Sequence, residues 1–348
     1  MGVRVLRVIA IIACLLAPLP ALAQDKPIPI KVVVIAAFEI GAETGDTPGE
    51  FQHWVERYPL TETVKIPGIE RPARLSPDGV LAITTGMFGR ARGSMAALLL
   101  DPRFDFSKSY FLMAGIAGVD PKIGSIGSAA WSDWVVDADP LYEIDDREIT
   151  PGWPWGLYAF HSKGPGEKGS GEGASGMAWR LDPGLTQWAY RLTRDIALPD
   201  GPKLAAERAG YKDEPAAQQP PRVFVGSSLA TVRFWHGRRR TDWARDWVRL
   251  QTDGAGVLAM TDGEDQAVLD TLNLYAKEGR VDPRRVLVLR TASNYSWPGA
   301  GKPMRIEFAD GGSAAAFEAA YRVGSPVVKA LVAGWDRYAE TLPQASAP

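Results

Sequence analysis

A glycine-rich turn follows one of the apolar segments and could present backbone N–H groups to a ligand. The segment Ile83–Ser94 (ITTGMFGRARGS) runs from an apolar strand into a helix of small residues. Backbone N–H groups in such a turn can bind an anion or a hydroxyl-rich ligand, and Arg90 and Arg92 could add positive charge. The segment lacks the glycine spacing of the dinucleotide fingerprint and the Lys-Ser/Thr end of the P-loop. A tight turn between strand and helix is the alternative interpretation.

Two glycines stand three residues apart at the end of a second apolar segment. In Met113–Val119 (MAGIAGV), Gly115 and Gly118 would let the backbone approach a flat ligand closely. Ligands of open α/β sheets bind outside the carboxyl ends of the strands, where these glycines are expected to lie. Close packing between the strand and a helix is the alternative.

Two carboxylates open a predicted helix in the segment Met260–Asp265 (MTDGED). A carboxylate at this place could accept two hydrogen bonds from a sugar diol. The alternative is that its negative charge only complements the helix dipole.

A further apolar strand ends in small polar residues, in the segment Leu289–Tyr295 (LRTASNY). Asn294 offers a donor and an acceptor side by side, which suits the edge of a purine ring. The alternative is a turn of the kind that Ser and Asn favour.

The histidines and acidic clusters predict neither a metal nor another cofactor. His53, His161 and His236 lack the spacing of zinc ligands, and the sequence contains no serine-elbow motif. His236 could act as an acid, a base or a ribose contact, or it could be a surface histidine that is already hydrogen-bonded. The acidic stretch Asp137–Glu148 lacks the spacing of a calcium loop.

Residues 1–23 have the order of a secretory signal peptide. Arg4 and Arg7 precede the apolar stretch Val8–Leu19, and Ala21–Ala23 supplies a small-residue cleavage site. Cleavage there would remove Cys14, the single cysteine of the chain. A membrane anchor is the alternative, which the prolines in the apolar stretch disfavour.

Composition and charge exclude several classes of protein. The 348 residues include 39 Lys and Arg against 41 Asp and Glu, so the formal charge of -2 leaves no electrostatic footprint for nucleic acid. After residue 23 the longest stretch without a charged residue is 149–162, which is too short to cross a bilayer. We therefore expect a soluble exported protein, periplasmic or secreted, with no transmembrane segment in the mature chain.

Continuous apolar runs alternate with helical patterns, which predicts an α/β fold whose strands are buried on both faces. Residues 24–348 are predicted to form a single domain with insertions near 162–176 and 200–221, where Gly, Ser, Pro, Ala and Gln accumulate. The predicted strands are Val32–Ala37, Val80–Thr84, Tyr110–Ala114, Val223–Val225, Val257–Met260 and Val286–Leu289. The predicted helices are Ser94–Leu100, Leu185–Ile196, Glu264–Glu278 and Ala314–Ala339, the last with a break at Pro326.

Several of these segments together resemble the purine nucleoside permease family, over roughly residues 30 to 338. That family in turn resembles the nucleoside phosphorylases and nucleosidases. The resemblance implies a three-layer α/β domain with a central mixed sheet flanked by helices and a pocket for base and ribose. The stretches that carry it are Tyr110–Pro121 (YFLMAGIAGVDP), Gly124–Val136 (GSIGSAAWSDWVV), Tyr142–Glu148 (YEIDDRE), Thr261–Asp265 (TDGED) and Val286–Asn294 (VLVLRTASN).

The resemblance also implies which residues meet the two halves of a nucleoside. Gly115 and Gly118 would lie beside the base, and Glu264 would hold the ribose hydroxyls. Ser293 and Asn294 would contact the five-membered ring of the purine. The nucleosidases usually carry an Asp general acid where this sequence has Asn294, so nucleoside binding is better supported than any particular cleavage.

The residues that the resemblance suggests for a phosphate site and for a hydrolytic base match the nucleosidases less well. By resemblance, Thr85 and Gly86 would meet ribose or phosphate. Arg90 and Arg92 are the nearby candidates for an anion site. Glu39 and Glu43 lie near the position of the hydrolytic base, but neither aligns cleanly.

Two functions of different class follow from the resemblance. The exported protein would bind purine nucleosides and support their transport and uptake. Alternatively, it would cleave the N-ribosidic bond with water or phosphate, and Asn294 and Glu264 would be its catalytic residues. A third alternative is an exported α/β protein with a vestigial pocket. An oligomer is compatible with each of these functions.

Overall fold

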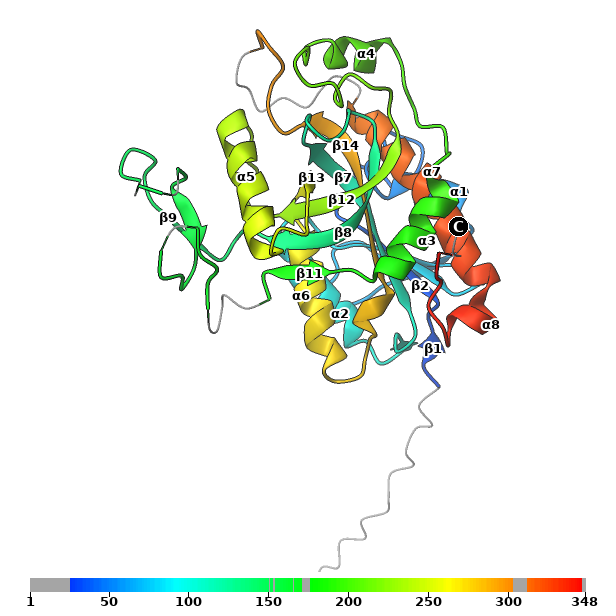
Figure 1. The fold of residues 1–348 in the computed structure, drawn as a ribbon. Coiled ribbons are helices and arrows are strands. Elements are labelled where there is room, and N and C mark those ends of the chain that lie inside the picture. The colour runs from blue at the N-terminus through cyan, green and yellow to red at the C-terminus, as the bar shows by residue number, and fades with distance from the viewer. Residues whose placement is uncertain are drawn as a thin grey trace, which may run out of the picture.

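A computed structural model describes residues 26–345, except residues 150, 153, 165, 171–175 and 303–311. The predicted signal peptide lies outside the described residues, and so does part of the predicted insertion at 162–176. The other predicted insertion, at 200–221, contains the short helix α4 (Pro202–Arg208), which lies at the top of Figure 1.

Ten of the described strands form one mixed sheet. Its order is β11-β8-β12-β13-β7-β2-β5-β4-β3, and β14 pairs with both β7 and β8. Two small two-stranded sheets, β1 with β6 and β9 with β10, are separate from it. The strands of the large sheet are β2 (Val32–Ala36), β3 (Glu62–Val64), β4 (Ala73–Leu75), β5 (Val80–Thr84), β7 (Tyr110–Val119), β8 (Ala129–Asp137), β11 (Ala178–Arg180), β12 (Val223–Ala230), β13 (Leu258–Asp262) and β14 (Val286–Tyr295). The small sheets contain β1 (Ile28–Pro29), β6 (Phe104–Asp105), β9 (Leu141–Glu143) and β10 (Leu157–Ala159).

Five strands of this sheet close into a barrel, which the expected three-layer arrangement does not include. Strand β14 runs parallel to β7 and antiparallel to β8, so that Leu289 lies opposite both Ala114 and Trp131. The circuit β7-β14-β8-β12-β13 then returns to β7. Register shifts in β12 and β14 add local bend and twist, which favours closure. The mixed sheet is as expected, but the three-layer description covers only part of it.

Layers do occur where β2, β5 and β7 extend from the barrel. Helices α2 (Arg90–Leu99) and α6 (Asp265–Ala276) belong to the apolar cluster on one face, which includes Val33. Helices α1 (Gln52–Arg57), α3 (Pro183–Thr193) and α7 (Gly312–Ala333) belong to the cluster on the other face, which includes Val34 (Figure 1). Successive residues of a strand point to opposite faces, so the continuous apolar run of β2 serves both clusters. Helix α5 (Arg238–Gln251), the 3₁₀ turn η1 (Pro283–Arg285) and helix α8 (Trp335–Tyr338) complete the described helical elements.

The C-terminal helix corrects one expectation. A break was expected at Pro326, because proline removes a helical hydrogen bond and crowds the preceding turn. Instead α7 continues through Pro326 to Ala333. The flanking residues Val323, Val327 and Val328 are fully buried against the sheet, and this burial outweighs the local cost of the proline.

None of the helices in the described part of the chain combines the length and the apolar character that crossing a bilayer requires.

Candidate functional site

A cavity of about 360 Å³ lies where β2, β7, β13 and β14 end or bend, close to the start of α6. Its volume is in the range of small-molecule sites. Apolar side chains form much of its wall, from Ile40, Met87, Phe88, Ile116, Phe234, Trp235 and Phe317. The polar lining comes from Glu50, Arg233, Thr261, Asp262, Glu264, Ser293, Asn294 and Ser313.

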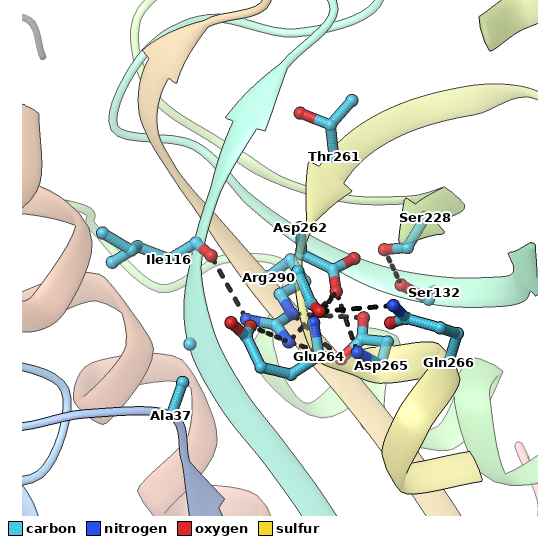
Figure 2. A network of polar contacts seen from close by, with 12 residues as sticks. Ala37, Ile116, Ser132, Ser228, Thr261, Asp262, Glu264, Asp265, Gln266 and Arg290 are labelled. Carbon is cyan, nitrogen blue, oxygen red and sulfur yellow. Dashed lines mark hydrogen bonds and ion pairs between the residues drawn. The ribbon is translucent and has the colours of Figure 1, made fainter. Parts of the chain in front are cut away.

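A buried arginine on β14, Arg290, is surrounded by carboxylates, two of which belong to residues that line the cavity (Figure 2). Arg290 Nη2 lies 2.5 Å from an oxygen of Asp265 and 3.3 Å from Asp262 Oδ1. It also lies 3.4 Å from Glu264 Oε2, while Nη1 donates to the carbonyl of Ile116 at 3.2 Å. The surrounding carboxylates raise the pKa of Arg290 well above its usual value despite burial, which opposes the charged form. The guanidinium therefore stays charged and orders the acidic groups around it.

Asp262 at the end of β13 is the least satisfied member of this group. Its Oδ1 accepts the backbone N–H groups of Glu264 at 3.1 Å and of Asp265 at 3.0 Å. Its Oδ2 is buried and has no hydrogen-bond partner among the described residues. Burial raises the pKa of Asp262 well above its usual value; the charge of Asp265 acts in the same direction, and Arg290 opposes it. These features fit a carboxyl group that keeps its proton.

Glu264 begins helix α6 and lines the cavity. Its Oε1 accepts the backbone N–H of Phe88 at 3.0 Å, which ties the glycine-rich turn to the helix. Phe88 has a φ of 57°, an uncommon value for a residue with a side chain. The predicted carboxylate at this helix start thus lies at the cavity and is held on two sides, by Phe88 and Arg290.

Glu50 is a second carboxyl group in the cavity, and it comes from the segment before α1. Its two oxygens accept the backbone N–H groups of Ala37 at 2.6 Å and of Ile116 at 2.7 Å. Burial raises its pKa to about 7; the charge of Arg290 and the two N–H groups oppose the rise, and Glu264 adds to it. Glu50 therefore titrates near neutral pH.

Gly115 makes room for the contact between these charged groups. A Cβ on Gly115 would lie 2.5 Å from Arg290 Nη1 and 2.7 Å from Glu50 Oε1. Because both groups are buried, neither has space to move away. The structure therefore requires a glycine here for packing around the acidic cluster, and Gly115 does not itself line the cavity.

Ser293 and Asn294 form the other polar end of the cavity. Ser293 Oγ donates to Asn294 Oδ1 at 2.9 Å, and Asn294 Nδ2 donates to the carbonyl of Tyr295 at 3.0 Å. These contacts fix the amide orientation and leave its second N–H for another acceptor. The pairing of β14 with β7 shifts register between Ala292 and Asn294, an irregularity of the kind that redirects side chains.

Gly118 lies next to this amide and lines the cavity. A Cβ there would approach Thr261 Oγ1 to 2.7 Å and Asn294 Nδ2 to 3.2 Å. The predicted small-residue wall is thus present at Gly118, with Thr261 and Asn294 beside it.

The structure does not bring all of the predicted residues to the cavity. Thr85 and Gly86 are absent from its lining, although Met87 and Phe88 of the same turn belong to it. Arg92 is half exposed and its guanidinium pairs with Asp270.

Other candidates from the sequence also have partners elsewhere. Arg90 is exposed and lies 3.8 Å from Glu70. Glu43 pairs with Arg74 at 2.6 Å. Glu39 Oε2 accepts the backbone N–H of Phe51 at 2.9 Å at the start of α1, so this carboxylate has a structural role. His236 lies 3.0 Å from the carbonyl of Tyr295 and does not line the cavity.

Three residues of this charged cluster were not identified as site residues from the sequence: Arg290, Asp262 and Glu50. Arg290 had a readable signal, because a single arginine interrupts the apolar strand VLVLRTASN and a buried charge needs carboxylate partners. Asp262 stood in the quoted TDGED segment. Glu50 had no signal, since it lies in an irregular loop outside every motif.

The solved structures that this chain resembles include nucleosidases. The 5′-methylthioadenosine/S-adenosylhomocysteine nucleosidase of Neisseria meningitidis, in complex with methylthio-immucillin-A, is 15% identical with a TM-score of 0.50, and the match covers 86% of this chain and 99% of that one. A variant of the Helicobacter pylori nucleosidase with 5′-methylthioadenosine in its active site is 14% identical with a TM-score of 0.51, over 86% and 99% of the two chains. At such low identity these matches define the fold class, a nucleosidase-like α/β fold.

The chain belongs to the purine nucleoside permease (NUP) family, whose profile matches residues 29–343. A purine nucleoside permease of Candida albicans is 28% identical over 306 residues, which cover 83% of this chain and 73% of the relative. A probable purine nucleoside permease of Schizosaccharomyces pombe is 27% identical over 268 residues, 74% of this chain and 76% of the relative. The family resemblance drawn from the sequence motifs is confirmed.

Proposed function

We propose that the protein binds purine nucleosides in this cavity and supports their transport and uptake. One observation carries the proposal. The fixed amide of Asn294 and the carboxylate of Glu264 both line the same cavity. The relatives named as purine nucleoside permeases and the nucleosidase-like fold support the same class of ligand.

The base would lie at the Gly118 and Asn294 end. A purine has an acceptor nitrogen on its five-membered ring, and the second N–H of Asn294 can donate to it. Gly118 leaves the space that a flat bicyclic ring needs, since a side chain there would crowd Thr261 and Asn294. A pyrimidine lacks the five-membered ring, so we expect it to bind more weakly.

The ribose would lie at the Glu264 end. A carboxylate can accept hydrogen bonds from two neighbouring hydroxyl groups, and Arg290 Nη2, 3.4 Å from Glu264 Oε2, helps to hold this side chain in place. We further propose that residues 1–23 are removed on export and that the protein acts in the periplasm or outside the cell.

A second candidate function is hydrolysis of the N-ribosidic bond, and Glu50 is the observation that favours it. A cavity carboxyl group with a pKa of about 7 has the property that a general base for water requires. Asn294 weighs against cleavage, because an amide can donate a hydrogen bond to the departing base but cannot protonate it. Phosphorolysis has less support, since Arg92 pairs with Asp270 away from the cavity lining.

Calorimetric titration with inosine and uridine, followed by assay of the same mixtures for free base with and without phosphate, tests both candidates. We expect saturable binding of inosine, weaker binding of uridine and no release of base. Equal binding of both nucleosides, or binding of neither, would contradict the proposed site. Release of hypoxanthine would replace the binding function with the enzymatic one.

A further inference from the structure

Glu50 and Glu264 line one cavity but come from distant parts of the chain. Glu50 precedes α1, and Glu264 begins α6. Both are buried, with exposed fractions of 4% and 7%, and Arg290 stands beside both. The cavity lining therefore contains two carboxyl groups besides the fully buried one of Asp262, whereas the function proposed above uses only Glu264.

The acidic group contains more negative charge than its one cation can balance. Glu50, Asp262, Glu264 and Asp265 surround Arg290, so full ionisation would leave three of the four negative charges uncompensated. Uncompensated buried carboxylates take up protons instead. Asp262, with its unpartnered Oδ2, fits one such protonated group, but its side chain is fully buried. The carboxyl group of Glu50, in contrast, titrates near neutral pH and belongs to a residue that lines the cavity.

Other charged groups near Glu50 are engaged with different partners. Glu39 binds backbone N–H groups at the start of α1, including that of Phe51 at 2.9 Å. His53 of α1 and Glu318 of α7 lie 3.5 Å from each other. No additional cation from these described elements pairs with Glu50, so Arg290 remains the compensating charge.

A bound nucleoside would shift this balance toward protonated Glu50. The ligand would displace water from the cavity, and lower solvation disfavours the charged form of a carboxyl group. The neutral group also gains an O–H that can donate to an oxygen of the sugar, while its two oxygens keep the N–H groups of Ala37 and Ile116.

We propose that Glu50 binds the sugar as a neutral carboxyl group, so that in alkaline solution each nucleoside bound is accompanied by the uptake of one proton from solvent. This inference rests on the proposed function, because it assigns a second sugar-binding residue in the same cavity. It makes nucleoside capture stronger in acidic than in alkaline surroundings.

The test is calorimetric titration of the full-length mature protein with inosine from about pH 5.5 to 8.5. We expect affinity to be constant at the acidic end and to fall above neutral pH, approaching about tenfold per pH unit. At the alkaline end, the binding enthalpy should vary with the ionisation enthalpy of the buffer, with a slope that indicates uptake of one proton.

Glu50→Gln supplies the decisive variant, since its amide donates a hydrogen bond at every pH. We expect inosine affinity without pH dependence, at a level below the acidic wild-type value because the amide oxygen can accept only one of the N–H groups of Ala37 and Ile116. The matched control is Asp137→Asn, which removes another buried carboxyl group whose pKa is raised to about 7 but which does not line the cavity. The control should keep the wild-type pH profile.

Two results would overturn the inference while leaving the binding function in place. One is inosine affinity that does not change with pH in the wild-type protein, and the other is a pH profile that survives Glu50→Gln. If a thermal melt shows that Glu50→Gln does not fold, Glu50→Asp replaces it. The aspartate still titrates, so inosine affinity should still depend on pH. Loss of the pH dependence in this variant would contradict the inference. Absence of inosine binding at every pH would instead contradict the proposed function itself.

Discussion

At the scale of single residues, Asn294 determines what the base end of the cavity can do. Its Oδ1 accepts from Ser293 and its Nδ2 donates to Tyr295, so only one amide N–H is left for a ligand. A donor of this kind binds an acceptor nitrogen at any pH near neutrality and transfers no proton. The residue therefore suits a protein that holds a purine nucleoside intact.

Asn294→Ala should weaken inosine binding and leave uridine binding nearly unchanged. Loss of one hydrogen bond lowers affinity by about tenfold or less, because such bonds contribute about 0.5–1.5 kcal/mol. Titration with both nucleosides measures the purine preference, and a thermal melt serves as the control for folding. A preference equal to that of the wild-type protein would place the base elsewhere.

Glu264→Gln should weaken binding of inosine more than binding of 2′-deoxyinosine. Hydrogen bonds to a charged group contribute about 1.5–3 kcal/mol each, and the deoxynucleoside has one hydroxyl fewer to lose. The matched control is Glu278→Gln, which makes the same charge change at a carboxylate that lies 3.5 Å from Arg280, where neither residue lines the cavity. Equal weakening of both ligands would mean that Glu264 only stabilises the start of α6.

At the scale of elements, much of the sheet could be predicted from the sequence. The β-branched runs of β2 and β5 were predicted almost to the residue, since a strand buried on both faces leaves a continuous apolar pattern. Three residues of the predicted motifs, Gly118, Glu264 and Asn294, line the cavity, and their role as ligand-binding residues stays a prediction.

Other elements depend on contacts that are distant in sequence. Closure of the barrel needs β14 to pair with β8, and no local pattern records that pairing. Glu50 reaches the cavity from an irregular loop because its carboxylate binds the N–H of Ala37, which follows β2, and the N–H of Ile116 within β7. Helix α7 passes through Pro326 because tertiary packing overrides local propensity.

Gly115→Ala should destabilise the protein by about 1–3 kcal/mol, a cost typical of overpacking. The new Cβ would lie 2.5 Å from Arg290 Nη1, in a strand that cannot move freely. The matched control is Gly93→Ala in helix α2, where a Cβ meets nothing within 4 Å. We expect the control to stabilise the protein by about 0.5–1 kcal/mol. Denaturant unfolding measures both changes, and equal effects would contradict the packing role of Gly115.

At the scale of the whole molecule, buried carboxyl groups link stability to pH. Burial raises the pKa of Asp137 from 3.8 to about 7, so the folded protein holds a proton there that the unfolded chain has released. Folding stability from this group is therefore lost as pH rises between these two values. Glu50 acts in the same direction.

Asp137→Asn should consequently raise the melting temperature at pH 8, with a gain in unfolding free energy of up to about 4 kcal/mol. The amide can still accept the backbone N–H of Asp139, which now lies 2.8 Å from Asp137 Oδ1. The gain should shrink as pH falls and vanish at about pH 3.5, where both states of the wild-type protein are protonated. A variant no more stable than the wild-type protein at pH 8 would refute the prediction.

The whole fold serves to bring the two ends of one cavity together. The barrel strands β13 and β14 supply Thr261, Ser293 and Asn294, and the start of α6 supplies Glu264. The family profile spans residues 29–343, so it covers every one of these elements. Binding of a whole nucleoside, rather than of a base or a sugar alone, is the central claim.

A crystal structure of the mature protein grown with inosine tests that claim most directly. We predict density for one intact nucleoside in the cavity, with the purine beside Gly118 and its five-membered-ring nitrogen within hydrogen-bond distance of Asn294 Nδ2. The ribose hydroxyls should contact Glu264, and the sugar should contact Glu50. Inosine bound outside the cavity, or bound with its ribose at Asn294 and its base at Glu264, would contradict the claim.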